Sequence, residues 1–81
     1  MARPNIHSGN ESVLKMLGAA VRELRQERSL SQEAFADLAG LDRSYMGGIE
    51  RGEHNLTVMS LLRIATALDC KASVLMSEAD V

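Results

Sequence analysis

The stretch that decides the fold is QEAFADLAGLDRSYMGGIER, which runs from Gln32 to Arg51. We interpret it as two short helices joined by a turn at Gly40, a residue type that often ends a helix in the left-handed conformation. In this reading one side of the helix pair is apolar. The side chains that we expect to point inward are Phe35, Ala36, Ala39, Leu41, Met46 and Ile49.

Small residues occupy the positions where the two helices must nearly touch, at Ala36 and Gly40. This pattern is typical of a helix-turn-helix whose second helix enters a DNA major groove. The alternative is an ordinary antiparallel helix pair in a small bundle. The two small residues, together with the hydrophobes at Leu41, Met46 and Ile49, favour the DNA-binding geometry. The residues left outward on the second helix are Arg43, Ser44, Gly47 and Arg51.

The chain of 81 residues is short enough to be one domain, and only 2% of its residues are aromatic. A domain this small buries only about 60–65% of its unfolded surface, so a partner subunit would help to stabilise it. No window approaches the roughly 20 apolar residues of a membrane helix, and no signal-peptide stretch opens the chain. One cysteine cannot form an internal disulfide, which fits a reducing compartment. We expect a cytoplasmic protein without a membrane partner.

The net charge is unusual for a nucleic-acid-binding protein. The formal net charge is -2 and the isoelectric point is about 5.6, whereas most DNA-binding domains carry a basic stripe. Lysines and arginines alternate with glutamates along the chain. A few arginines on one face, with the acidic residues on another, would still allow DNA binding.

The chain divides into a polar tail, residues 1–10, and one folded unit, residues 11–81. The tail is expected to be flexible; alternatively, it is an arm that reaches DNA through Arg3. A first helix is predicted at about 11–28, from apolar residues that recur at three and four residue steps. The residues of its predicted inner face are Val13, Leu14, Leu17, Val21 and Leu24.

Residues with short polar side chains mark the beginnings of the next helices. Ser31, Asp42 and Thr57 are expected to cap the second, third and fourth helices, and Gly52 to end the third. The fourth helix should extend to about Leu68 and a fifth should span about 72–79. We predict that Ile64 lies beside the inner stripe of the fourth helix and Met59 outside it. That stripe is expected to comprise Val58, Leu61, Leu62, Ala65 and Leu68.

Three segments of the chain resemble a known family: LRQERSLSQEAFADLAGLDRS, YMGGIERGEHNLT and LLRIATALDCKASVL. The run from Leu24 to Leu75 is similar to the lambda-repressor-like, Xre-type regulators. Within that family, RSYMGGIERGEHNLT most resembles the small controller proteins of restriction–modification systems. The resemblance implies an all-α, five-helix lambda-repressor-like DNA-binding domain. It also implies a transcriptional regulator that binds double-stranded DNA as a homodimer on a palindromic operator.

The resemblance and the chemistry together suggest base contacts at the start of the third helix. Arg43 has the geometry to bind a guanine O6/N7 edge with two hydrogen bonds. Ser44 is short enough to contact a base edge or a phosphate. Tyr45 lies either at the DNA surface or half-buried against the second helix. At Gly47 and Gly48, the absence of a side chain would allow close approach to the groove; otherwise they mark a weak helix held by tertiary packing.

Phosphate contacts are expected at two helix N-termini, where free backbone N–H groups and the helix dipole favour an anion. Gln32 begins the second helix, and Ser31 either helps there or acts only as its cap. Arg51, at the end of the third helix, is assigned to the phosphates as well. The family counterparts of three residues before the fourth helix grip the other side of the DNA backbone; here these are His54, Asn55 and Thr57.

Glu50 is an acidic residue on a helix that should face DNA. The resemblance implies a structural role, in which Glu50 pairs with Arg25 and locks the recognition helix to the first helix. The homodimer interface is expected on the fourth and fifth helices, at Ile64, Val74 and Leu75. Leu75 matches a family core position, so Ile64 and Val74 are the better candidates for the interface.

Several functional classes are disfavoured. Cys70 matches a buried valine in the family, and neither His7 nor His54 has metal-ligand spacing with it. No nucleophile–base pair is visible, so we expect no enzyme activity, cofactor, metal or small-molecule ligand. The alternatives that remain are a DNA-binding antitoxin of a toxin–antitoxin pair and a protein-interaction module that has this fold without DNA.

Overall fold

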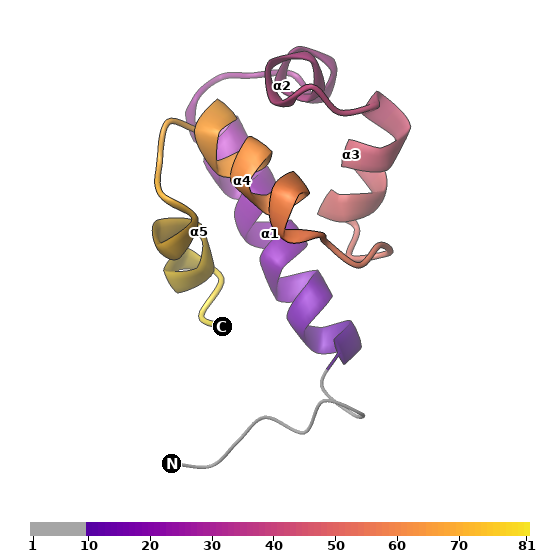
Figure 1. Ribbon diagram of the computed structural model, residues 1–81, viewed down its shortest axis with the longest axis vertical. Helices are drawn as coiled ribbons and strands as arrows, with labels where there is room; N and C mark the ends of the chain where they lie inside the picture. Colours follow the sequence, from indigo (N-terminus) through magenta and orange to yellow (C-terminus); the bar gives the residue numbers. More distant parts are fainter. Residues whose placement is uncertain (1–9) are drawn as a thin grey trace.

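The structure of the protein, a computed structural model, describes residues 10–81, and the expectations for Arg3, His7 and the rest of the tail lie outside this range. All the regular secondary structure in the described range is helical, as the predicted fold class requires (Figure 1). None of these helices has the length and apolar character needed to span a bilayer. The five helices are α1 (Asn10–Glu27), α2 (Gln32–Ala39), α3 (Arg43–Glu50), α4 (Val58–Ala67) and α5 (Ala72–Glu78).

The predicted N-caps are confirmed. The Ser31 hydroxyl accepts a hydrogen bond from the Ala34 N–H at 3.0 Å, and Thr57 does the same for Ser60 at 3.0 Å. Asp42 accepts from the N–H of Tyr45 at 3.2 Å. Each cap satisfies one of the N–H groups that the first turn of a helix leaves without a partner. Gly40 ends α2 with φ of 68° and Gly52 follows α3 with φ of 76°, both in the left-handed region.

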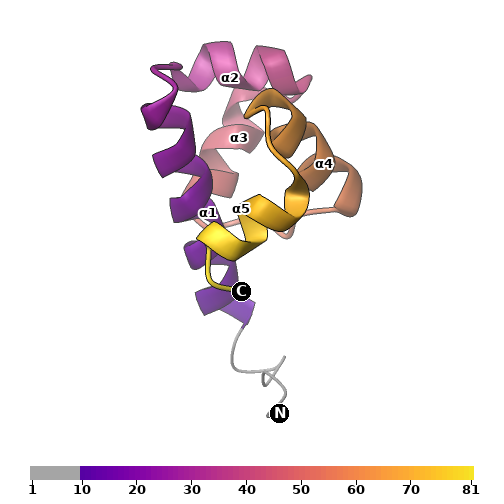
Figure 2. The same cartoon turned by 90° about the vertical axis from the view of Figure 1, so that its left-hand side faces the viewer.

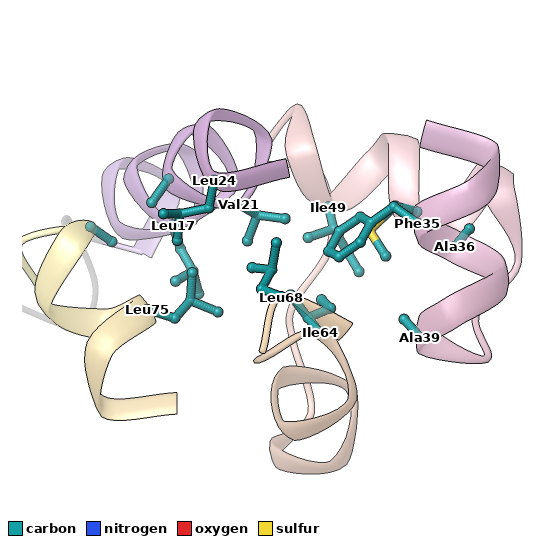
Figure 3. Close-up of a cluster of buried hydrophobic side chains, with 13 residues drawn as sticks. Leu17, Val21, Leu24, Phe35, Ala36, Ala39, Ile49, Ile64, Leu68 and Leu75 are labelled. Carbon is teal, nitrogen blue, oxygen red and sulfur yellow. The ribbon is translucent and has the colours of Figure 1, made fainter. Parts of the chain in front are cut away.

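The helices enclose one apolar core. Helix α1 packs against α3 and α5, α2 packs against α3 and α4, and α4 packs against α5. Helix α5 therefore lies on the opposite side of the molecule from α3, as two perpendicular views show (Figures 1 and 2). Figure 3 shows side chains from all five helices meeting in this core. The largest of the fully buried residues are Phe35, Met46, Ile49, Ile64, Leu68, Leu75 and Val21.

The inner stripe predicted for α4 is confirmed at Leu61, Ala65 and Leu68 and wrong at its other positions. Ile64 is fully buried, whereas Val58 and Leu62 are 71% and 44% exposed. The stripe that faces the core consists of Leu61, Ile64, Ala65 and Leu68. Apolar residues cover more than one face of this helix, so the sequence pattern is compatible with more than one buried face. Only contact with the neighbouring helices decides which face is buried. On α1, Val13 is likewise 37% exposed although it was predicted to face inward.

Two of the three residues predicted for the dimer interface belong to the monomer core. Ile64 and Leu75 have no exposed surface, so neither is available to a second subunit. They pack where α4 and α5 close over α1 (Figure 3). Val74, the third candidate, is 45% exposed. The prediction for Ile64 and Leu75 is therefore wrong, because α5 turns its buried side toward α1 and α4.

Helices α1 and α3 touch through their backbones at Gly18. A Cβ atom at this position would overlap the carbonyl oxygen of Ile49 and lie 2.7 Å from that of Glu50. Any side chain here would push α3 away from α1. Gly18 therefore sets how closely the third helix approaches the first, a role that the sequence pattern did not reveal.

Candidate nucleic-acid interface

The exposed side of α3 begins immediately after its Asp42 cap. Arg43 and Ser44 form its first turn and are both exposed, as predicted. The opposite side of the helix carries Met46 and Ile49, which are buried in the core. Helix α3 and the loop that follows it form one edge of the molecule, at the right of Figure 1. The helix can therefore present a short polar face while its apolar face holds it to the domain.

Gly47, which was predicted to lie outward, is buried, and so is Gly48. A Cβ atom on Gly47 would lie 3.1 Å from Nη1 of Arg51 and 3.3 Å from Oε1 of Gln32. A Cβ atom on Gly48 would overlap the ring of His54. The groups that approach these glycines closely are thus side chains of the same chain.

A network of charged and polar side chains joins α3 to α1 and α2. Arg25 Nε donates to Glu50 Oε2 at 2.7 Å, and Arg25 Nη2 donates to Glu50 Oε1 at 3.0 Å. Gln32 Nε2 also donates to Glu50 Oε1, at 3.1 Å, and Arg25 Nη1 donates to the Leu30 carbonyl at 2.8 Å. The side chains of Arg25 and Glu50 are only 12% and 3% exposed. The ion pair implied by the resemblance is therefore present. The hydrogen bonds that the Arg25 guanidinium donates to Glu50 raise the pKa of Arg25.

The contact between Gln32 and Glu50 was not predicted from the sequence. It engages one N–H of the Gln32 side chain, at the helix end where a phosphate contact is predicted. At the N-terminus of α2, the Ser31 hydroxyl is bonded to the N–H of Ala34. The backbone N–H groups of Gln32 and Glu33 come before the first intrahelical donor, the N–H of Phe35, so they have no acceptor within the helix and point out of its N-terminus. A phosphate contact at this end of α2 would therefore use the backbone.

A depression of about 140 Å³ lies where α1, α2 and α3 meet, lined by Arg22, Arg25, Gln32, Gly47, Glu50 and Arg51. Within this lining Glu50 offsets the charge of Arg25, and Arg51 pairs with Glu53 outside it. Arg22 was not among the residues predicted to contact DNA. Arg22 and Arg51 are both exposed, so two guanidinium groups lie beside the start of α2 in a chain of net charge -2.

The loop after α3 carries the remaining candidates. Arg51 Nε donates to Glu53 Oε2 at 3.0 Å, and this hydrogen bond lowers the pKa of the Glu53 carboxyl. His54, Asn55 and Thr57 are all exposed. Tyr45 is half-buried, but its hydroxyl lies 3.5 Å from Ser60 Oγ on α4. Of the two readings of Tyr45, the structure supports a half-buried ring, with α4 rather than α2 beside its hydroxyl.

Comparison with known proteins gives the family. A helix-turn-helix family model matches residues 21–75. The control protein C.SmaI of Serratia marcescens is 37% identical over 65 residues, which cover 80% of this chain and 77% of that protein. The control protein C.MunI of a Mycoplasma species is 39% identical over 62 residues, which cover 75% of this chain and 84% of that protein. The crystal structure of the restriction-modification controller C.AhdI from Aeromonas hydrophila superposes with a TM-score of 0.78 and 48% identity, and covers 79% of this chain and 97% of that one.

The chain belongs to the helix-turn-helix family of DNA-binding transcriptional regulators. Within that family it is similar to the control proteins named above, over most of their length as well as its own.

Proposed function

We propose that this protein is the controller of a restriction–modification system, which binds a palindromic operator as a homodimer and regulates transcription there. The observation that carries the proposal is the exposed first turn of α3, with Arg43 and Ser44 outward on a helix whose other side is fixed by the Arg25–Glu50 pair. The similarity to control proteins of comparable length supports the particular system.

In this proposal the base contacts come from the exposed part of α3. Arg43 binds a guanine through its O6 and N7 atoms, which is the commonest base-specific contact in the major groove. Ser44 contacts an adjacent base edge or phosphate. Tyr45 and the Gly47 backbone border this contact, although Gly47 itself is covered by the side chains of Gln32 and Arg51.

Phosphate contacts flank the base contacts on both sides. On one side are the N-terminus of α2, at Ser31 and Gln32, and the guanidinium groups of Arg22 and Arg51 that line the depression beside it. On the other side is the N-terminus of α4, where the helix dipole also favours an anion. The residues proposed for that second side are His54, Asn55 and Thr57.

The dimer interface in this proposal uses exposed apolar side chains of α4 and α5. Val74 is 45% exposed on α5, and Leu62 is 44% exposed on α4. Since α5 lies away from α3 (Figure 2), an interface through these residues leaves both recognition helices free. Two such helices on one face of DNA are separated by one helical turn, about 34 Å, which corresponds to half-sites about 10 base pairs apart.

The proposal is tested by selecting binding sites from random double-stranded DNA with the purified protein. The expected result is an inverted repeat whose half-sites are about one helical turn apart. Footprinting on the DNA upstream of the protein's own gene should then protect a matching sequence. Selection that enriches no sequence would contradict a DNA-reading function. Enrichment of a single, non-repeated half-site by a monomer would contradict the dimer.

A further inference from the structure

Gly48 occupies a position in α3 where a glycine is costly. In the interior of a helix, glycine is less favourable than alanine by about 1 kcal/mol. Its φ is not in the left-handed region, where a glycine would be required. The ring of His54 occupies the space where a side chain on Gly48 would lie, with its Cγ 3.4 Å from the position of a Cβ atom. The missing side chain therefore makes room for this imidazole.

One further contact touches the ring, and two others hold the groups around it. The centroid of the Tyr45 ring lies 5.3 Å from that of His54, with an interplanar angle of 36°, a separation at which aromatic rings attract one another. The hydroxyl of Tyr45 lies 3.5 Å from Ser60 Oγ, on α4. The N–H of Glu53 donates to the carbonyl of Gly48 at 2.8 Å, which ties the preceding loop residue to the same turn of α3.

The seated ring extends the exposed face of α3. Gly48 follows Ser44 by four residues, so the two positions are neighbours on the helix surface. Ser44 and His54 are both exposed. The imidazole therefore lies next to the polar first turn of α3, although His54 itself comes from the loop.

We infer that Gly48 and Tyr45 are positioning residues that form a seat for His54 and hold its imidazole ready to donate a hydrogen bond to a DNA phosphate oxygen. The inference rests on the proposed function and identifies residues that act through His54 rather than by touching DNA themselves. A loop side chain that is already held in its bound position loses less conformational entropy on binding. The absence of a side chain at position 48 thus contributes to operator affinity.

A double-mutant cycle tests the seat. Gly48→Ala places a Cβ atom where the ring now lies, while alanine favours the helix. We expect unchanged or higher thermal stability and an operator affinity that is lower by roughly three- to tenfold, the value of one net hydrogen bond. His54→Ala should lower the affinity by the same factor. The Gly48→Ala, His54→Ala double variant should bind like His54→Ala alone, because the effect of Gly48 is transmitted through the ring.

Gly47→Ala is the matched control, because it is the same substitution at the neighbouring position. Its Cβ atom would meet the flexible ends of Arg51 and Gln32, so its effect on affinity should be independent of His54. Wild-type affinity in Gly48→Ala, or effects of Gly48→Ala and His54→Ala that simply multiply, would overturn the inference. If Gly48→Ala fails to fold, the same cycle is measured with Tyr45→Leu in the wild-type and His54→Ala backgrounds. Effects of Tyr45→Leu and His54→Ala on operator affinity that simply multiply would also overturn the inference. A wild-type protein that selects no DNA would overturn the proposed function and this inference together.

Discussion

The replacement of Glu50 by alanine should strongly destabilise this domain. The Glu50 carboxylate accepts two hydrogen bonds from Arg25 and one from Gln32, and its side chain is only 3% exposed. The substitution leaves the guanidinium of Arg25, itself 12% exposed, without its anionic partner. Stranding one member of a buried ion pair costs about 3–5 kcal/mol.

This loss is large for a chain of 81 residues. At about 0.05–0.15 kcal/mol per residue, such a domain has a total free energy of unfolding of roughly 4–12 kcal/mol. Each kcal/mol shifts the melting temperature of a domain of this size by about 4–8 °C. We therefore expect Glu50→Ala to lower the melting temperature by at least about 12 °C.

Circular dichroism melting curves measure the effect, and Glu53→Ala provides the control. Glu53 also pairs with an arginine, but the side chains of Arg51 and Glu53 are 60% and 54% exposed, so solvent screens the pair and its removal should change the melting temperature little. Equal melting temperatures for Glu50→Ala and Glu53→Ala would refute the reasoning. A second test is the Arg25→Met, Glu50→Leu double variant, which strands no charge and should recover much of the stability lost in Glu50→Ala.

Four further predictions follow from the geometry of the proposed interface. Arg43→Ala should weaken operator binding by about 1–3 kcal/mol and relax the preference at one base pair; a selection experiment that returns the wild-type preference would exclude base readout by this residue. Arg22→Ala should weaken all DNA sequences about equally and reduce the salt slope of binding by about one, and an unchanged slope would remove Arg22 from the phosphate contacts. Val74→Glu should give a monomer by sedimentation while the helical circular dichroism is kept, whereas a variant that still sediments as a dimer would place the interface elsewhere. The hydrogen bond from Arg51 lowers the pKa of Glu53 in the folded state. The pair should therefore stabilise the fold at pH values above the unfolded-state pKa of Glu53, and this stabilisation should be lost as the pH falls through the lower folded-state pKa. The NMR titration midpoint of Glu53 should rise in Arg51→Ala, and an unchanged midpoint would contradict this prediction.

The features that were predicted well from the sequence are those that depend on interactions between residues close together in the chain. The caps at Ser31, Asp42 and Thr57 involve a side chain and a backbone N–H three residues away, so neighbouring residues in the sequence are sufficient to specify them. The left-handed turn at Gly40 is similarly local. The exposed position of Arg43 followed from the apolar period of α3.

The elements that sequence predicted poorly depend on contacts between helices. Ile64 was misplaced because α4 has apolar residues on more than one face, and packing against α2 and α5 decides which face is buried. The hydrogen bond from the Gln32 side chain to Glu50 was not predicted, because a contact between residues 18 positions apart is invisible in a local pattern. The contact between Gly48 and His54 was not predicted for the same reason, since His54 comes from the following loop.

The backbone contact at Gly18 has a consequence for how this domain can change its target. Helix α3 is held through Gly18, Ile49 and Glu50 on its inner side, while the residues proposed to read bases, Arg43 and Ser44, take no part in that attachment. Positions 43 and 44 can therefore be substituted with little loss of stability, since a substitution on the exposed surface usually changes the free energy of unfolding by less than about 0.5 kcal/mol. A protein of this design can acquire a new operator by exchanging two side chains, while the angle at which its helix meets the DNA stays the same.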